Sequence, residues 1–310
     1  MIPVRRMKSG CNFFLSIVML TGIIFLTQGC APENRIDQLK RNVLETLSTQ
    51  EGDFAIAFSD LSTGERLMIN EKEVFHAAST MKTPVMIEIF KQGTLGILSL
   101  NDSIEVKNDF KSIVDSSRYS LSPDDDSEHE LYNQLGSKKP IGDLVYDMII
   151  MSSNLATNIV IEYADAKKVT QTMRDLGAPD IEILRGVEDT KAYERGLSNT
   201  TTAYDLLVIY EKLAKGEAVN PDMDKQMVDI LLNQHFNEII PAKLPDEVKV
   251  AHKTGSITGV QHDSGIVILP DGRKYVLVIL SKNLRDVEHS IDAMANVSHQ
   301  IYDFVAERSH

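Results

Sequence analysis

Residues 79–90 read STMKTPVMIEIF, and this stretch decides the fold. The apolar run from Val85 to Phe90 predicts a helix that begins near Ser79. Residues three apart share a helix face, so the hydroxyl of Ser79 and the ammonium of Lys82 become neighbours. A desolvated lysine can take the proton of a serine hydroxyl, and backbone N–H groups at a helix N-terminus suit an oxyanion. The stretch therefore predicts an activated serine, with a capping serine and a surface lysine as the alternative.

The sequence on both sides of this stretch predicts one sheet built from the two ends of the chain. Alternating and short apolar runs predict strands, and apolar residues at helical spacing predict helices. The expected elements are a helix at 36–47, strands at 54–58, 66–70, 248–251, 265–269 and 275–280, and a final helix at 287–304. We therefore predict an α/β (α+β) fold in which terminal helices flank an antiparallel five-stranded sheet. Residues 31–82 and 241–310 form its α/β lobe, residues 83–240 form an inserted all-helical lobe, and the active site lies between the lobes.

The first 29 residues differ in kind from the rest. Three basic residues, Arg5, Arg6 and Lys8, precede an apolar run from Phe13 to Leu26. This run is shorter than the roughly 20 residues of a transmembrane helix, which is the alternative, and the arrangement is typical of a signal peptide. Gly29-Cys30-Ala31 also resembles a lipoprotein cleavage site. We expect export to the periplasm, or attachment to the envelope through a lipid on Cys30.

Composition narrows the functional class further. The chain is 43% hydrophobic and 25% charged, as expected for a globular protein. Its two cysteines, Cys11 and Cys30, lie in or beside the predicted leader, so no disulfide is expected in the mature fold. Loss of the leader, which has three basic and no acidic residues, takes the formal charge from −13 to −16. Such an acidic body argues against nucleic acid as a partner.

Two further motifs raise the significance of Ser79 and Lys82. Ser152-Ser153-Asn154 lies between helical segments, and Lys253-Thr254-Gly255-Ser256 lies near the end of a predicted strand. With Ser79 to Lys82 they resemble Ser-x-x-Lys, Ser-Asp-Asn and Lys-Thr-Gly, the ordered signature of class A β-lactamases and penicillin-binding proteins. The resemblance covers nearly all of the mature chain, and it implies the β-lactamase/transpeptidase-like fold.

This resemblance implies a role for each matching residue. Ser79 would attack the carbonyl of a β-lactam, Lys82 would manage its proton, and Ser152 would protonate the leaving nitrogen. The backbone N–H groups of Ser79 and Ser256 would bind the oxyanion. The remaining motif residues would bind substrate. Asn154 would contact the acylamide of the substrate, and Lys253 and Thr254 would hold its carboxylate. Gly255 belongs to the same substrate-binding motif and lies between Thr254 and Ser256.

The sequence departs from the family pattern in the loop that supplies the deacylating glutamate. The family has Glu-x-x-Leu-Asn after an arginine. Here that glutamate position falls on Val187 when aligned from Arg185, and on Gly186 when aligned from Thr200 to Thr202. Glu188 is the candidate base, Glu194 is the second candidate, and a loop carboxylate paired with Arg185, Lys191 or Arg195 is the alternative for both.

Four smaller departures leave open questions. Ser153 stands where the motif has aspartate. His262 could replace the missing carboxylate-binding arginine, or could simply pair with a neighbour. Tyr119 or Tyr132 could line the cleft or only pack. The acidic residues 124–130 lack the EF-hand pattern and predict a solvated surface loop.

Together these features predict a serine β-lactamase that works through an acyl-Ser79 intermediate. A D,D-peptidase or esterase, or a penicillin-binding sensor that deacylates slowly, is the alternative. The expected ligand is a β-lactam or a D-Ala-D-Ala-like peptide. No cofactor and no metal site are expected, and the chain is expected to be a monomer.

Overall fold

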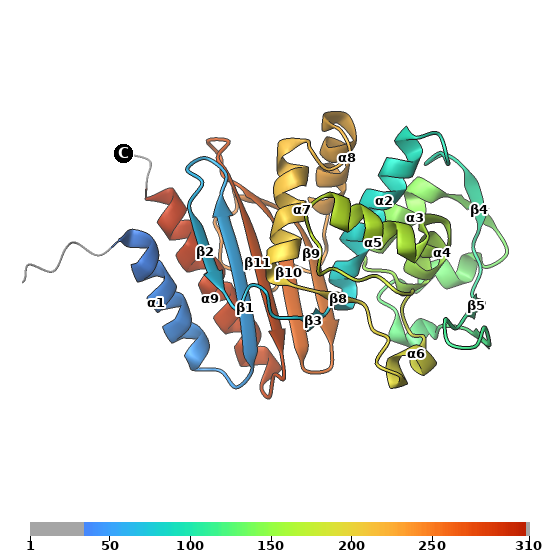
Figure 1. Ribbon diagram of the computed structural model, residues 1–310, viewed down its shortest axis with the longest axis horizontal. Helices are drawn as coiled ribbons and strands as arrows, with labels where there is room; N and C mark the ends of the chain where they lie inside the picture. Colours follow the sequence, from blue (N-terminus) through green and yellow to red (C-terminus); the bar gives the residue numbers. More distant parts are fainter. Residues whose placement is uncertain (1–33, 308–310) are drawn as a thin grey trace, which may run out of the picture. The chain divides into compact units, whose positions relative to one another are not determined.

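Strands from both ends of the chain form the central sheet of the computed structural model, which describes residues 34–307 (Figure 1). The predicted leader and Cys30 lie outside the described residues. The helices are α1 (Arg35–Ser48), α2 (Lys82–Thr94), α3 (Ile141–Ile150), α4 (Asn154–Ala164), α5 (Ala166–Asp175), α6 (Thr190–Glu194), α7 (Ala203–Lys215), α8 (Pro221–Leu231) and α9 (Val287–Ala306), with 3-10 turns η1 (Ala78–Met81), η2 (Pro123–Asp125) and η3 (Glu130–Gln134). The sheet strands are β1 (Asp53–Asp60), β2 (Arg66–Ile69), β9 (Lys249–Ile257), β10 (Val260–Ile268) and β11 (Lys274–Lys282).

The five strands are ordered β2-β1-β11-β10-β9, and every neighbouring pair is antiparallel. The first and last segments of the chain therefore meet in the middle of the sheet, where β1 pairs with β11. This arrangement confirms the predicted fold class. It also puts β9, which carries the Lys253 motif, at one edge of the sheet.

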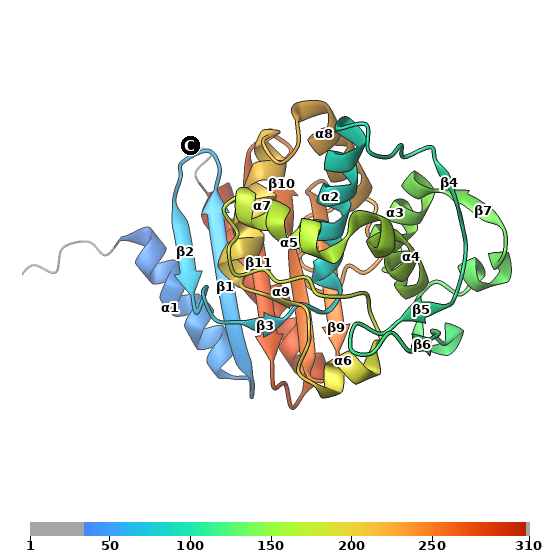
Figure 2. The same cartoon turned by 45° about the vertical axis from the view of Figure 1, so that its right-hand side comes forward.

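The alternation of side chains along β1 gives the sheet two different faces. Phe54, Ile56 and Phe58 lie in a core with α1 and α9, whereas Ala55 and Ala57 lie in the core of the helical part. Small residues on the second face let α7 contact β1, β10 and β11 directly. In Figures 1 and 2, α1 and α9 cover one face of the sheet, and α7 lies across the other.

Short two-stranded pairs tie together the segments around the helices. They are formed by β3 (Phe75–His76) with β8 (Thr200–Thr201), β4 (Ser103–Glu105) with β7 (Lys138–Pro140), and β5 (Phe110–Lys111) with β6 (Arg118–Tyr119). The part predicted to be all helical thus contains short strands. From Asn34 onward the chain clusters as one compact unit, so the exact division into two lobes stays a prediction. Within residues 34–307, no helix is long and apolar enough to span a membrane.

The C-terminal strands are longer than the sequence predicts. Lys253 to Ser256 continue β9, and Gln261 to Ser264 begin β10. Both runs are polar, so an apolar pattern does not reveal them. They remain in the sheet because their backbone groups pair with each other, with Lys253 opposite Ser264.

Candidate active site

Ser79 lies on η1, directly before α2, where the free N–H groups of the helix begin. Ala78 before it has a φ of 45°, a strained value for a residue with a side chain. Two bonds hold this backbone: the Ala77 N–H donates to the Asn199 carbonyl at 2.8 Å, and the Ala78 N–H donates to Nδ1 of His76 at 3.0 Å. Burial and Arg185 lower the pKa of His76, so its ring is uncharged and can accept this bond.

Lys82 is wholly buried at the first position of α2. Its Nζ donates to the Ser152 carbonyl at 2.6 Å, to the Ser152 hydroxyl at 3.2 Å and to Oδ1 of Asn154 at 2.9 Å. Burial lowers the pKa of Lys82 to about 7, against the opposing effect of the Asp126 and Glu188 carboxylates. A sizeable fraction of this amine is therefore neutral at pH 7 and able to take a proton.

The Ser152 hydroxyl lies between two lysine amines. Lys253 is also fully buried, and its Nζ donates to Oγ of Ser152 at 3.0 Å. Burial, followed by the effect of Lys82, lowers the pKa of Lys253 well below its usual value. Ser152 has a φ of 55°, which turns its side chain toward both amines. The three groups form a connected route along which a proton can move.

Gly255 allows β9 to lie close to Ser79. A Cβ at this position would lie 3.1 Å from the Ser79 amide nitrogen and 3.2 Å from the Ala78 Cβ. A side chain here would push these neighbours apart by a few tenths of an ångström, so glycine favours the close contact. The backbone of β9 thus runs against η1, which brings the Ser256 segment beside the amide of Ser79.

The loop from Glu182 to Thr200 closes the site from the other side. Backbone bonds between Glu182 and Thr200, at 2.9 and 3.0 Å, form its neck. Inside it, Asn158 clamps Val187: the Val187 N–H donates to Oδ1 at 2.6 Å, and Nδ2 donates to the Val187 carbonyl at 3.0 Å. Arg185 donates to the Leu197 carbonyl at 2.9 Å. These bonds fix the residue immediately before Glu188.

Glu188 points into the site from this loop. It has a φ of 61°, and its Oε1 accepts a 2.8 Å bond from Nδ2 of Asn154. Burial raises its pKa, and the Asp126 and Asp125 carboxylates raise it further. Asn154 therefore contacts Lys82 through its oxygen and Glu188 through its nitrogen. The alternative was that the Glu188 carboxylate pairs with a cation of the loop. Instead, Lys191 donates to Asp115, and Arg185 donates to loop carbonyls.

Two cavities meet at Ser79. One of about 430 Å³ is also lined by Asn154, Glu188 and Tyr193, and one of about 390 Å³ is also lined by Ser152, Thr254 and Phe236. Asn154, Ser256 and Asp125 border both. A larger hollow of about 580 Å³ lies between α1 and α9, but it contains none of the reactive groups. The chemistry therefore belongs to the cavities beside Ser79.

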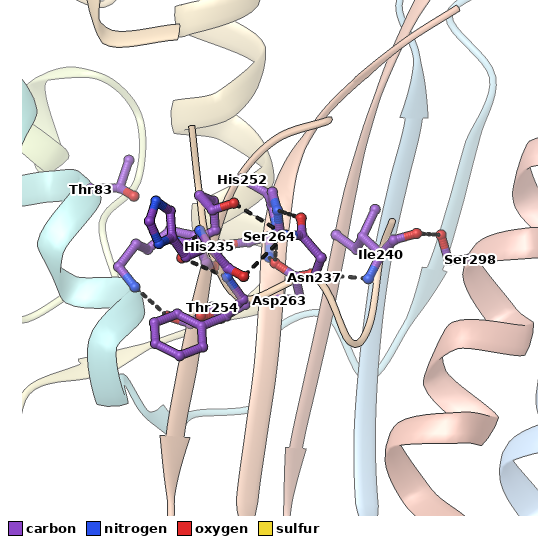
Figure 3. A network of polar contacts seen from close by, with 12 residues as sticks. Thr83, His235, Asn237, Ile240, His252, Thr254, Asp263, Ser264 and Ser298 are labelled. Carbon is purple, nitrogen blue, oxygen red and sulfur yellow. Dashed lines mark hydrogen bonds and ion pairs between the residues drawn. The ribbon is translucent and has the colours of Figure 1, made fainter. Parts of the chain in front are cut away.

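A buried polar network supports β9 from behind (Figure 3). Nδ1 of His252 lies 2.8 Å from Oδ1 of Asp263, and Nε2 lies 3.2 Å from Oδ1 of Asn237. Oδ2 of Asp263 accepts from the Ile240 N–H at 3.0 Å. The network holds the 237–240 segment, which helps to line the second cavity, against the strand next to Lys253.

Three sequence alternatives are resolved by this geometry. Glu194 is exposed on α6 and lines neither cavity, so Glu188 is the better placed carboxylate. His262 is buried with a pKa lowered to about 4, and its Nε2 lies 2.9 Å from the His76 carbonyl. An uncharged ring cannot replace an arginine. Tyr119 and Tyr132 line neither cavity; their hydroxyls bond the Val187 carbonyl and Asp126.

The prediction of a solvated acidic loop is wrong for one residue. Asp126 is only 4% exposed, and its carboxylate bonds the start of α4. Sequence reasoning missed Asp126 and also Asn158. Asn158 had a usable signal, because it lies four residues after Asn154 on the same helix face. Ser153, at the aspartate position of the motif, caps the start of α4: its Oγ accepts from the Ala156 N–H at 3.1 Å.

Fold and site together define a serine acyl-transfer hydrolase: a serine at a helix N-terminus, a buried lysine with a lowered pKa on the following turn, and a second hydroxyl between two lysine amines. The comparisons with known proteins agree. A model of the Beta-lactamase enzyme family matches residues 37–305. The chain belongs to this family, and it is a serine hydrolase that acts on β-lactams.

Individual relatives extend over nearly the whole chain. A "Beta-lactamase" of Bacteroides uniformis is 25% identical, covering 94% of this chain and 98% of that protein. The crystal structure of a β-lactamase from Sphaerobacter thermophilus DSM 20745 is 23% identical with a TM-score of 0.76, covering 88% and 99%. A mutant of PBP-A, solved as an acyl-enzyme complex with penicillin G, is 24% identical with a TM-score of 0.74, covering 87% and 97%.

Proposed function

We propose that this protein hydrolyses β-lactams through an acyl-Ser79 intermediate, with Lys82 and Ser152 serving acylation and Glu188 serving deacylation. The observation that carries the proposal is the Ser152 hydroxyl, which lies within 3.2 Å of one buried lysine amine and 3.0 Å of another, beside the nucleophile. Both lysines have lowered pKa values, so protons can be exchanged among these groups near neutral pH.

Acylation forms the bond between Oγ of Ser79 and the lactam carbonyl carbon and breaks the carbon–nitrogen bond of the ring. Neutral Lys82 takes the Ser79 proton, and Ser152 delivers a proton to the leaving nitrogen, which Lys82 replaces. The developing oxyanion is held by the Ser79 and Ser256 N–H groups. Lys253 and Thr254 bind the substrate carboxylate.

Deacylation adds water to the acyl carbon, with Glu188 taking its proton and returning one to Oγ of Ser79. Two observations support this role: Glu188 and Ser79 line the same cavity, and Asn154 holds the carboxylate at 2.8 Å. The raised pKa of Glu188, caused mainly by burial, makes its carboxylate a stronger base than that of an exposed glutamate.

Turnover of a chromogenic cephalosporin by the purified mature chain tests the proposal. Sustained turnover that Ser79→Ala abolishes is the expected result. An unchanged melting temperature of Ser79→Ala would show that the loss is chemical. A wild-type chain that is well folded but gives no turnover would contradict the proposal.

A second candidate is a D,D-peptidase, or a sensor that is acylated and deacylates slowly. One observation favours it: the loop residue that Asn158 clamps is Val187, whose side chain cannot act as a base. The carboxylate of Glu188 belongs to the next residue, which has a positive φ. Release of D-alanine from a peptide ending in D-Ala-D-Ala would favour the peptidase. A penicillin adduct that lasts for hours would favour the sensor.

We also propose that the chain is exported and attached to the envelope through a lipid on Cys30, and that the mature chain is a monomer. The basic and apolar leader and the residues around Cys30 support this localisation. Labelled palmitate should enter the wild-type protein in an expressing bacterium, and Cys30→Ser should remove the label. Sedimentation of the mature chain would report its oligomeric state.

A further inference from the structure

One carboxylate of the acidic loop is buried at the edge of the active site. Asp124 and Asp125 are exposed, whereas Asp126, the next residue, is 4% exposed. Its Oδ1 accepts from the N–H groups of Asn154 at 2.9 Å and Glu128 at 3.2 Å. Its Oδ2 accepts from the Leu155 N–H at 2.8 Å and the Tyr132 hydroxyl at 3.0 Å. Both oxygens are therefore fully engaged.

Two of these donors are free N–H groups at the start of α4, where a carboxylate is favoured by both hydrogen bonding and the helix dipole. The Ser153 hydroxyl caps a third N–H group, that of Ala156. Ser153 occupies the aspartate position of the Ser-Asp-Asn motif, so this motif lacks a carboxylate of its own. Asp126 supplies a carboxylate at the same helix end from a loop 28 residues earlier in the chain.

The residue that Asp126 holds is central to the site. Asn154 has its backbone fixed by Asp126, while its side chain contacts Lys82 at 2.9 Å and Glu188 at 2.8 Å. A shift of the Asn154 backbone would therefore move the one side chain that bonds both proton-transfer groups. The charge of Asp126 also acts on Lys82 directly and raises its pKa against the effect of burial.

We propose that Asp126 is a positioning residue for the reaction, which fixes Asn154 and thereby the spacing between Lys82 and Glu188. This inference rests on the proposed function. It predicts that Asp126 affects both acylation and deacylation, although it lines neither cavity beside Ser79.

The test compares Asp126→Asn with Asp124→Asn in the mature chain. The control changes the same charge in the same loop at an exposed position. Acylation and deacylation rates with benzylpenicillin are measured by rapid quenching and intact mass spectrometry. Asp126→Asn places an amide opposite N–H donors, and we expect both rates to fall about 10- to 100-fold, equivalent to about 1.4–2.7 kcal/mol. Asp124→Asn should stay within about 2-fold, as is usual for exposed sites.

The pH profile separates positioning from a loss of stability alone. Acylation needs neutral Lys82, and the Asp126 charge raises the pKa of Lys82. Its removal lowers that pKa, so the acidic limb of the acylation rate should move to lower pH. An unmoved limb, with a rate loss that follows the melting temperature alone, would overturn the proposal.

A double-mutant comparison tests whether Asp126 acts through Asn154. In an Asn154→Ala background, Asp126→Asn should have a much smaller effect on both rates. A full effect in that background would overturn the inference. If Asp126→Asn does not fold, Tyr132→Phe removes one donor and keeps the carboxylate; it should slow both rates, and less so in the Asn154→Ala background. A wild-type chain without any acylation would instead reject the proposed function.

Discussion

Replacing Glu188 by glutamine should convert the enzyme from one that turns over to one that stops after acylation. The substitution keeps the shape of the side chain and an oxygen that can accept the 2.8 Å bond from Asn154, so the site should stay assembled. It removes the group that takes the proton of water. Loss of a general base slows a step by about 10²- to 10⁴-fold, or about 2.7–5.4 kcal/mol of activation free energy. Acylation should change far less, because its base is Lys82.

Intact mass spectrometry after rapid mixing with benzylpenicillin measures both steps. Wild type should show a short-lived adduct, and Glu188→Gln should accumulate it in full. Glu194→Gln is the matched control, because that carboxylate is exposed on the adjoining helix α6. The acidic limb of wild-type deacylation should also lie above the range of an ordinary glutamate, because burial raises the pKa of a base that must be ionised. A wild-type deacylation rate in Glu188→Gln would refute this reasoning.

Three further outcomes are expected. The acylation rate should rise with pH around 7, where Lys82 loses its proton, in stopped-flow measurements; a rate that is flat from pH 5 to 9 would argue against Lys82 as the base. Asn158→Ala should lower the free energy of unfolding by about 2–5 kcal/mol in urea titrations, because it removes both bonds to Val187; a loss below about 0.5 kcal/mol would show that the clamp is unimportant. Asp263→Ala should cost about 1–3 kcal/mol in the same assay, because it leaves buried hydrogen-bonding groups of His252 and Ile240 without their partner; a neutral effect would contradict the role given to the network.

The sheet could be predicted because its apolar pattern is strong and local. Phe54, Ile56 and Phe58 alternate with two alanines, and this period is typical of a strand with two different faces. The ends of β9 and β10 could not be placed in the same way. The last residues of β9 and the first residues of β10 are polar, and they stay in the sheet because each strand supplies the other's backbone partners at the edge of the cleft.

In the site, too, a local sequence pattern predicts some of the contacts but not those between residues far apart in the chain. Ser79 and Lys82 are three residues apart, so helix geometry alone predicts that they share one face. It does not predict that the Lys82 amine bonds Ser152 and Asn154, which lie about 70 residues away. Glu188 was one of two candidates, because the sequence does not show that Asn158 fixes the residue before it. Asp126 looked like part of a solvated loop, since its partner Asn154 is 28 residues away. Contacts at such distances depend on the packed fold, and no local pattern reports them.

The central claim is that Ser79 becomes acylated and is then released. Its most direct test is peptide mapping by mass spectrometry of wild-type protein quenched at successive times after benzylpenicillin is added. The expected result is an adduct on the peptide that contains Ser79, which disappears as hydrolysed penicillin appears. Hydrolysis without any adduct on that peptide in either wild type or Glu188→Gln, or an adduct on a different residue, would contradict the claim.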